Sequence, residues 1–145
     1  MPDRRDLAEM LQPLLRSLIA AELPVLAAHG ISMWGYAVLA ALDDTSVRTQ
    51  AALAEAIGAD KTRIISTLDR LQEAGLISRT PDPRDRRARL LAATEEGSRI
   101  HRSVRADIQA NEDRLLARLP SADRQAFLRA VRTLSALSRE DVIGS

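Results

Sequence analysis

The first part of the chain has apolar side chains at helical spacing. They recur every three or four positions from Leu7 to Leu18, which predicts one long helix with an apolar face. Pro13 and Pro24 fall inside or next to this pattern. Because proline lacks a backbone donor and crowds the preceding turn, we expect the helix to be either kinked or broken at these positions.

Two shorter helices are predicted next. Ser32 is a favourable N-cap for a helix over Met33–Leu42, whose apolar residues face inward. The polar run Asp43–Ser46 then breaks the helical pattern. Thr49 caps a second short helix, which ends at the turn that begins at Gly58. Small residues in this turn allow two helices to cross closely.

The helix that begins near Lys61 has one apolar face and one polar face. Ile64, Leu68 and Leu71 lie on the apolar face. The opposite side carries Thr62, Ser66, Asp69 and Glu73, with Arg63 and Arg70 on one flank. Hydroxyls and cations occupy the first half of the polar face, and the acids come later. In a helix-turn-helix the start of the second helix enters the major groove, so this half would meet the base edges.

A hairpin with a basic tip is predicted after this helix. Gly75 ends the helix, and Leu76–Arg79 has the composition of a short strand. Two prolines and two aspartates then make a turn, and Arg87–Ala92 returns as a second strand with Arg87 and Arg89 on one face. This order is the outline of a winged helix-turn-helix. The expected fold class is therefore mainly α with a small β-hairpin wing.

Apolar helices return at the end of the chain. Thr94 is a favourable N-cap, and apolar residues continue at helical spacing to Leu119. After a break at Pro120, a last helix carries an apolar stripe from Phe127 to Leu137. A small DNA-reading domain cannot cover the stripes of both terminal regions. They therefore predict a partner outside the chain, and a homodimer is the commonest solution.

The positive charge of the chain is concentrated around the predicted reader. The formal net charge is only +1. Between Lys61 and Arg105, however, eleven Lys or Arg stand against six Asp or Glu, whereas the segment from Ala106 to Ser145 has six of each. A local excess of positive charge is what a surface that faces DNA phosphates requires.

Composition argues against several other classes of protein. The chain has no cysteine, which excludes disulfides, thiolate metal sites and thiol redox sensing. His29 and His101 are far apart and have no acidic cluster close in sequence, so no metal and no cofactor is expected. We find no catalytic nucleophile, no His–acid pairing and no phosphate loop, and an enzyme is not expected. The N-terminus resembles neither a signal peptide nor a transmembrane span, which predicts a cytoplasmic location away from membranes.

Four motifs follow one another in the middle of the chain. They are Gln50–Gly58 (QAALAEAIG), Leu68–Arg79 (LDRLQEAGLISR), Asp82–Arg87 (DPRDRR) and Thr94–Gly97 (TEEG). In this order they strongly resemble the multiple-antibiotic-resistance regulator (MarR) family of winged helix-turn-helix transcription factors. The resemblance covers residues 31–97 by motif and the full length by helix order.

The resemblance implies a homodimeric transcription factor whose first and last helices interlock. Residues 31–97 would form the DNA-binding lobe, and residues 1–30 and 98–145 the helical dimerisation lobe. Double-stranded DNA with a pseudo-palindromic operator is the implied partner. Family members are often repressors that are released by small phenolic or aromatic acids, so a small-molecule effector is a further expected partner.

The candidate DNA-binding residues lie on the reading helix and the wing. Matched by position, Arg87 is the wing-tip arginine that reaches the minor groove, and Asp85 is its orienting partner. Arg63 is the candidate for bidentate readout of guanine. The full set is Lys61, Thr62, Arg63, Ser66, Arg70, Arg84, Asp85, Arg86, Arg87 and Arg89, of which Lys61, Arg70, Arg84, Arg86 and Arg89 are expected to touch phosphates.

Large side chains are rare, because the chain has one Trp, one Tyr and one Phe. Met33, Trp34 and Tyr36 occur together at the start of the second helix and are the candidate effector pocket. Such residues are more often packing than pocket, and both interpretations stay open.

The sequence departs from the family pattern at Ala93, where a leucine usually precedes the threonine, and at the two prolines of the first helix.

An isolated basic hairpin is usually only a solvated surface. The alternative function is thus a winged-helix protein-interaction module without specific DNA binding. Arg87 and the hydroxyl-rich helix face favour DNA binding, and a steep loss of DNA affinity with salt would distinguish the two.

Overall fold

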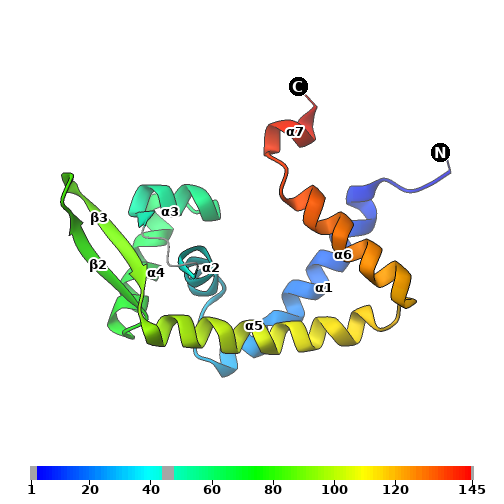
Figure 1. Ribbon diagram of the computed structural model, residues 1–145, viewed down its shortest axis with the longest axis horizontal. Coiled ribbons are helices and arrows are strands. Elements are labelled where there is room, and N and C mark those ends of the chain that lie inside the picture. Colours follow the sequence, from blue (N-terminus) through cyan, green and yellow to red (C-terminus); the bar gives the residue numbers. More distant parts are fainter. Residues whose placement is uncertain (1–2, 44–47, 145) are drawn as a thin grey trace. The chain divides into compact units, whose positions relative to one another are not determined.

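The computed structural model describes residues 3–43 and 48–144 (Figure 1). The chain divides into two compact units, Met1–Ile108 and Gln109–Ser145. Helices make up 69% of the structure, and three strands form one antiparallel sheet. The predicted fold class, mainly α with a small β wing, is confirmed. Of the predicted polar break Asp43–Ser46, only Asp43 lies within the described residues, and the side chain of Lys61 lies outside them.

The first unit contains the reader and the wing. Its helices are α1 (Leu7–Ala28), α2 (Met33–Leu42), α3 (Gln50–Ile57) and α4 (Lys61–Glu73). Its strands are β1 (Arg48–Thr49), β2 (Ile77–Asp82) and β3 (Asp85–Ala93), in the order β1-β3-β2. Helix α5 (Glu95–Leu116) begins in the first unit and ends in the second, which also holds α6 (Ser121–Ser135) and α7 (Arg139–Ile143).

Helix α1 continues through both of its prolines. Pro13 and Pro24 lie inside one unbroken helix of 22 residues, so the alternative of a broken helix is wrong. Each proline deprives the carbonyl four residues earlier of its helical donor, and those carbonyls belong to Glu9 and Ala20. Both residues are exposed in the chain, where water can bond to the freed carbonyls.

One apolar core joins α2, α3, α4 and the sheet. Val38, Leu39, Leu53, Leu68 and Leu91 are each fully buried in it. Burying such a side chain completely contributes about 1.5–3 kcal/mol relative to leaving it exposed. The core therefore anchors the apolar face of α4, and the polar face is left on the outside.

Side-chain caps define where the helices of the reader begin. The Ser32 hydroxyl accepts a 3.0 Å hydrogen bond from the first turn of α2, and the Thr49 hydroxyl accepts a 3.1 Å bond from the first turn of α3. Both predicted caps are confirmed. Helix α4 has a cap that was not predicted, because the Asp60 carboxylate accepts a 2.7 Å bond from the backbone N–H of Arg63. Each such cap contributes about 1 kcal/mol.

The wing is longer than the sequence predicted. Strands β2 and β3 pair from Ile77 opposite Ala93 to Asp82 opposite Asp85, so the pairing continues through most of the expected turn. The Asp82 carboxylate accepts a 2.9 Å hydrogen bond from the backbone N–H of Arg84 and closes the tip. Strand β1 was not predicted, because two residues are too short to form a recognisable pattern.

The long helix α5 ends earlier than its apolar stripe. The stripe predicted a helix that reaches Leu119, but α5 ends at Leu116. The Arg124 guanidinium donates hydrogen bonds of 3.1 Å and 3.3 Å to the carbonyls of Leu116 and Leu119. The Leu116 carbonyl also accepts the backbone N–H of Leu119 at 3.0 Å, so Arg124 adds a second donor to this carbonyl at the end of α5.

The last predicted helix is two helices. The apolar stripe predicted one helix through Leu137, whereas α6 ends at Ser135 and α7 follows. Ser138 and Asp141 form a reciprocal capping pair that starts α7. The stripe continues past the end of α6, which is why periodicity alone missed the break.

Several apolar side chains on α1, α6 and α7 are exposed in the single chain. Leu15 is 56% exposed and Leu134 is 60% exposed. By length and composition α1 alone among the described helices could cross a membrane, with a mean hydropathy of 1.3 and 6% of its most apolar window buried. These two properties also suit a helix whose apolar face packs against another protein, so they are weak evidence for a membrane span.

Candidate nucleic-acid interface

Helix α4 presents its predicted polar face to solvent. Ile64, Leu68 and Leu71 are buried, as the sequence predicted. The exposed residues include Thr62, Arg63, Ser66, Asp69, Arg70 and Glu73. The first half of this surface therefore carries hydroxyl and guanidinium groups, which are the groups that bond to base edges and phosphates.

Two hydroxyl groups of α4 are bonded back to the helix. Ser66 Oγ and Thr67 Oγ1 donate hydrogen bonds of 3.2 Å and 3.3 Å to the carbonyl of Arg63. Their protons are therefore occupied, and their oxygen lone pairs stay available. An exposed Ser66 in this state can accept from the amino group of adenine or cytosine.

Arg63 lies against the ring of Trp34, which belongs to α2. The Arg63 Cζ is 5.9 Å from the ring centroid, within the range of a cation–π contact. The two side chains line a narrow crevice with no space for a water molecule. The other lining residues are Val38, Ile57, Ala59, Ile64 and Thr67. Trp34, a candidate effector residue from the sequence, thus contacts the reading helix.

The other two candidate effector residues do not line this crevice. Met33 is 38% exposed. Tyr36 stacks on His101 of α5, with ring centroids 5.2 Å apart and an interplanar angle of 27°. The structure therefore places Trp34 and Tyr36 in different surroundings, although both belong to α2.

Both histidines have acidic neighbours that lie far away in the sequence. The buried His101 has its Nδ1 3.2 Å from the Asp43 carboxylate, and the Nε2 of His29 is 2.9 Å from the Asp107 carboxylate. The expectation that neither histidine is paired with an acid is wrong, because it considered only sequence neighbours. Within residues 3–43 and 48–144, no three side chains are grouped as a metal site requires.

An ion pair joins the reading helix to the wing. Arg79 of β2 donates a hydrogen bond to the carboxylate of Asp69 on the polar face of α4. The Arg79 side chain is 17% exposed and that of Asp69 is 56% exposed. Arg79 therefore offsets an acidic charge beside the candidate DNA-binding residues. The sequence did not predict this pair, because periodicity does not show which side chains of a helix and a strand meet.

The wing presents its arginines to solvent. Arg84, Arg86, Arg87 and Arg89 are exposed, and none of their guanidinium groups forms an ion pair within the described part of the chain. The Asp85 carboxylate accepts a 3.0 Å hydrogen bond from the backbone N–H of Arg87. Asp85 thus holds the backbone at Arg87, and the guanidinium has no carboxylate partner among the residues that the structure describes.

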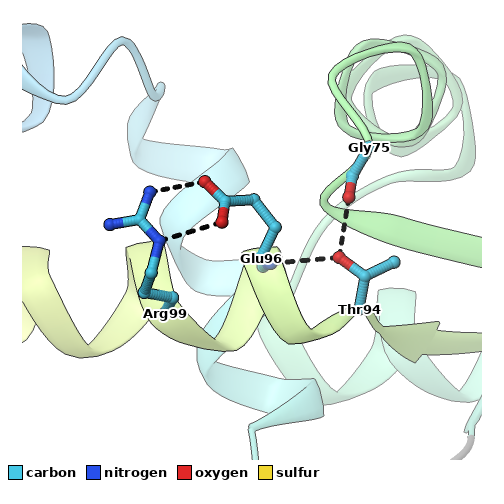
Figure 2. Close-up of polar contacts among 5 residues, drawn as sticks. Gly75, Thr94, Glu96 and Arg99 are labelled. Atoms are coloured by element: carbon cyan, nitrogen blue, oxygen red, sulfur yellow. Dashed lines mark hydrogen bonds and ion pairs between the residues drawn. The ribbon is translucent and has the colours of Figure 1, made fainter.

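Thr94 connects the end of the reading helix to α5 (Figure 2). Its hydroxyl donates a 2.7 Å hydrogen bond to the Gly75 carbonyl and accepts a 3.0 Å bond from the Gly97 N–H. A Cβ at Gly97 would lie 2.0 Å from the carbonyl oxygen of Leu76. The spacing of threonine and glycine in this motif therefore has a geometric cause.

The first turn of α5 holds a second ion pair (Figure 2). The Arg99 Nε donates a 2.8 Å hydrogen bond to the Glu96 carboxylate. Hydrogen bonding from Arg99, together with its charge, lowers the pKa of Glu96 below the ordinary value of 4.5. The charge of Arg99 is thus offset within the protein, in contrast to the charges of the wing arginines.

Comparison with known proteins identifies the family of the chain. The model of the MarR family matches residues 29–88. The transcriptional regulator HosA of Escherichia coli O111:H- is 31% identical over 99 residues, which cover 68% of this chain and 73% of HosA.

Three solved structures are similar to the chain over at least 90% of its length. The PcaV transcriptional regulator from Streptomyces coelicolor, in complex with its natural ligand, is 30% identical with a TM-score of 0.66 and covers 91% of this chain and 96% of PcaV. CouR from Rhodococcus jostii RHA1, bound to p-coumaroyl-CoA, is 25% identical with a TM-score of 0.74. The match covers 92% of this chain and 94% of CouR. The transcriptional repressor CouR bound to a 23-mer DNA duplex is 27% identical with a TM-score of 0.75. The match covers 90% of this chain and 92% of that CouR chain.

Proposed function

The chain belongs to the MarR family of transcriptional regulators, and on this premise we propose that it is a homodimeric repressor of a pseudo-palindromic operator in double-stranded DNA. Members of the family are transcriptional regulators and not enzymes. One observation carries the proposal. The exposed first half of α4 and the wing lie in the same compact unit, and the wing arginines have no carboxylate partner among the described residues.

The residues divide into two proposed roles. Unpaired guanidinium groups release condensed counterions when they contact phosphates, which supplies affinity without sequence preference. The proposed phosphate contacts are Lys61, Arg70, Arg84, Arg86 and Arg89. Sequence preference comes from base edges and from minor-groove width. The proposed specificity residues are Thr62, Arg63 and Ser66 in the major groove and Arg87 in the minor groove, with Asp85 as the residue that orients Arg87.

Selection of bound duplexes from a random DNA pool provides the operator for a direct test. Arg87→Ala should weaken binding to the selected duplex more than to a scrambled duplex. Lys61→Ala should weaken binding to both and reduce the salt slope by about one unit. Equal losses on both duplexes for both variants would contradict this division of roles. DNA affinity without salt dependence would instead favour the protein-interaction module.

The dimer is proposed from the exposed apolar faces of α1 and α6, with residues 1–30 and 98–145 as the dimerisation lobe and residues 31–97 as the DNA-binding lobe. The same pairing would cover α1 without a membrane, and we place the protein in the cytoplasm. Two reading helices would then contact half-sites about one helical turn apart, roughly 34–36 Å. Footprinting measures the spacing of the two half-sites, and sedimentation measures whether the protein is a dimer. A protein that sediments as a monomer and protects a single half-site would overturn the dimer.

Release by a small aromatic or phenolic ligand is proposed from two lines of support. PcaV was solved with its natural ligand and CouR with p-coumaroyl-CoA. In this chain the half-buried Tyr36 stacks on the completely buried His101, so only the tyrosine of this pair can offer an aromatic surface to a ligand. The crevice at Trp34 has no space for water, so Tyr36 and the neighbouring Met33 are the better candidates. A panel of aromatic acids added to the operator complex tests this proposal, which fails when no acid changes the affinity.

A further inference from the structure

We propose that Trp34 is a positioning residue that orients Arg63 toward DNA. The inference rests on the proposed function, because it requires Arg63 to lie at the DNA surface. Trp34 is on α2 and Arg63 is on α4, and the guanidinium carbon is 5.9 Å from the ring centroid. A residue outside the helix-turn-helix would thus act on a residue that reads DNA.

The position of Arg63 on α4 makes such support necessary. Arg63 immediately precedes the buried Ile64 and lies one turn before Thr67, which is only half-exposed. Arg63 and Thr67 line the crevice with Trp34, so Arg63 leaves α4 on the flank that faces α2. An arginine on the flank reaches a groove only when its long side chain follows the surface outward. The ring of Trp34 provides that surface.

The contact leaves the hydrogen-bond donors of Arg63 available. A guanidinium has five N–H donors, which lie in its plane. The attraction to an aromatic ring is between the positive charge and the face of the ring, and it uses no hydrogen-bond acceptor. No carboxylate within the described chain lies at ion-pair distance from Arg63. Trp34 can therefore hold the group in one direction without occupying the donors that guanine or a phosphate would accept from.

The surroundings of the contact keep the ring in place. Val38, Ile57 and Ile64 line the same crevice, which has no space for water. Because Arg63 itself is exposed, its cation–π contact is of the weaker, solvent-exposed kind. An arginine that is already held loses less rotamer freedom when it binds DNA. Loss of the ring should therefore weaken DNA binding by about two- to fivefold.

A double-mutant cycle on DNA affinity tests the inference. Trp34→Leu should weaken binding to the selected duplex by about two- to fivefold when Arg63 is present, and should change little in the Arg63→Ala background. Trp34→Phe keeps an aromatic face and should recover most of the affinity. Equal losses in both backgrounds would show a merely structural role for Trp34. Arg63→Ala with wild-type affinity would also overturn the inference.

Failure of the proposed function gives a different result. In that case the wild-type chain would bind the selected and scrambled duplexes alike, whatever residue occupies position 34. When the wild-type chain prefers the selected duplex and only the cycle fails, the DNA-binding function stands and the positioning role of Trp34 does not.

The fluorescence of Trp34 provides a second test that leaves the ring intact. Trp34 is the only tryptophan of the chain, so its emission reports on this one contact. Arg63→Ala should increase the quenching of the free protein by acrylamide, and the matched control Arg70→Ala on the same helix should not. Addition of the selected duplex to the wild-type chain should leave quenching low. Increased quenching on the duplex would mean that Arg63 leaves the ring when it binds, which would overturn the inference.

Discussion

The hydroxyl of Thr94 donates a 2.7 Å hydrogen bond to the backbone carbonyl of Gly75, just after the end of α4. The same hydroxyl accepts the backbone N–H of Gly97 in the first turn of α5. The Thr94 N–H also donates a 3.0 Å bond to the carbonyl of Leu76. One residue thus links the end of the reading helix, the start of β2 and the start of α5.

Replacing Thr94 by valine should destabilise the first unit by about 1–2 kcal/mol. Valine has nearly the same shape but can neither cap α5 nor donate to Gly75. Urea unfolding measures the change, and Thr94→Ser should recover most of the loss because it keeps the hydroxyl. Wild-type stability for Thr94→Val would mean that the hydroxyl contributes nothing.

Replacing Gly97 by alanine should cost about 2–3 kcal/mol, because the new Cβ would lie 2.0 Å from the Leu76 carbonyl oxygen and the backbone must move. Gly75→Ala is the matched control. Gly75 has φ +75° and open space around its Cβ position, so alanine there meets only the conformational cost of about 1–2 kcal/mol. Thermal or urea unfolding of both variants checks the order, and a larger loss for Gly75→Ala would contradict the steric explanation.

Replacing Arg79 by methionine should weaken binding to any duplex by about two- to fivefold. Methionine keeps the length of the apolar stem and removes the charge that offsets Asp69, whose carboxylate would then face the phosphates. Adding Asp69→Asn to this variant should restore much of the affinity. Affinity measured at two salt concentrations checks the result, and a loss that Asp69→Asn does not change would argue against an electrostatic cause.

The stability of the chain should depend on Glu96 at acidic pH. Because hydrogen bonding from Arg99 lowers the pKa of Glu96 in the folded state, this pair stabilises the fold above the ordinary value of 4.5. The contribution is lost as the pH falls through the lowered pKa. Urea unfolding between about pH 2.5 and 6.5, a window of about two units either side of 4.5, should show the stability difference between wild type and Glu96→Gln shrinking at the acidic end. A difference that stays constant with pH would contradict the assignment, and Glu95→Gln, one residue earlier, is the matched control.

Local patterns of the sequence predicted the elements that depend on neighbouring residues. The caps at Ser32 and Thr49 were predicted because a capping hydroxyl bonds within the next turn of the chain. The buried face of α4 followed from its spacing of apolar residues, and the order of motifs identified the family. Sequence periodicity failed to predict very short elements such as β1 and α7. It also failed to predict a helix end where the apolar stripe continued past that end.

The sequence by itself determined the fold class, the family and the polar face of α4 that is exposed, because periodicity, capping and motif order act between near neighbours. Only the tertiary structure decided which distant side chains meet: Trp34 with Arg63, Asp69 with Arg79, and Tyr36 and Asp43 with His101. These contacts depend on how helices cross and on how strands align, and no local pattern encodes either. The same limit explains why the sequence left open whether Trp34 packs or lines an effector pocket, and why its contact with the reading helix came only from the crevice between α2 and α4.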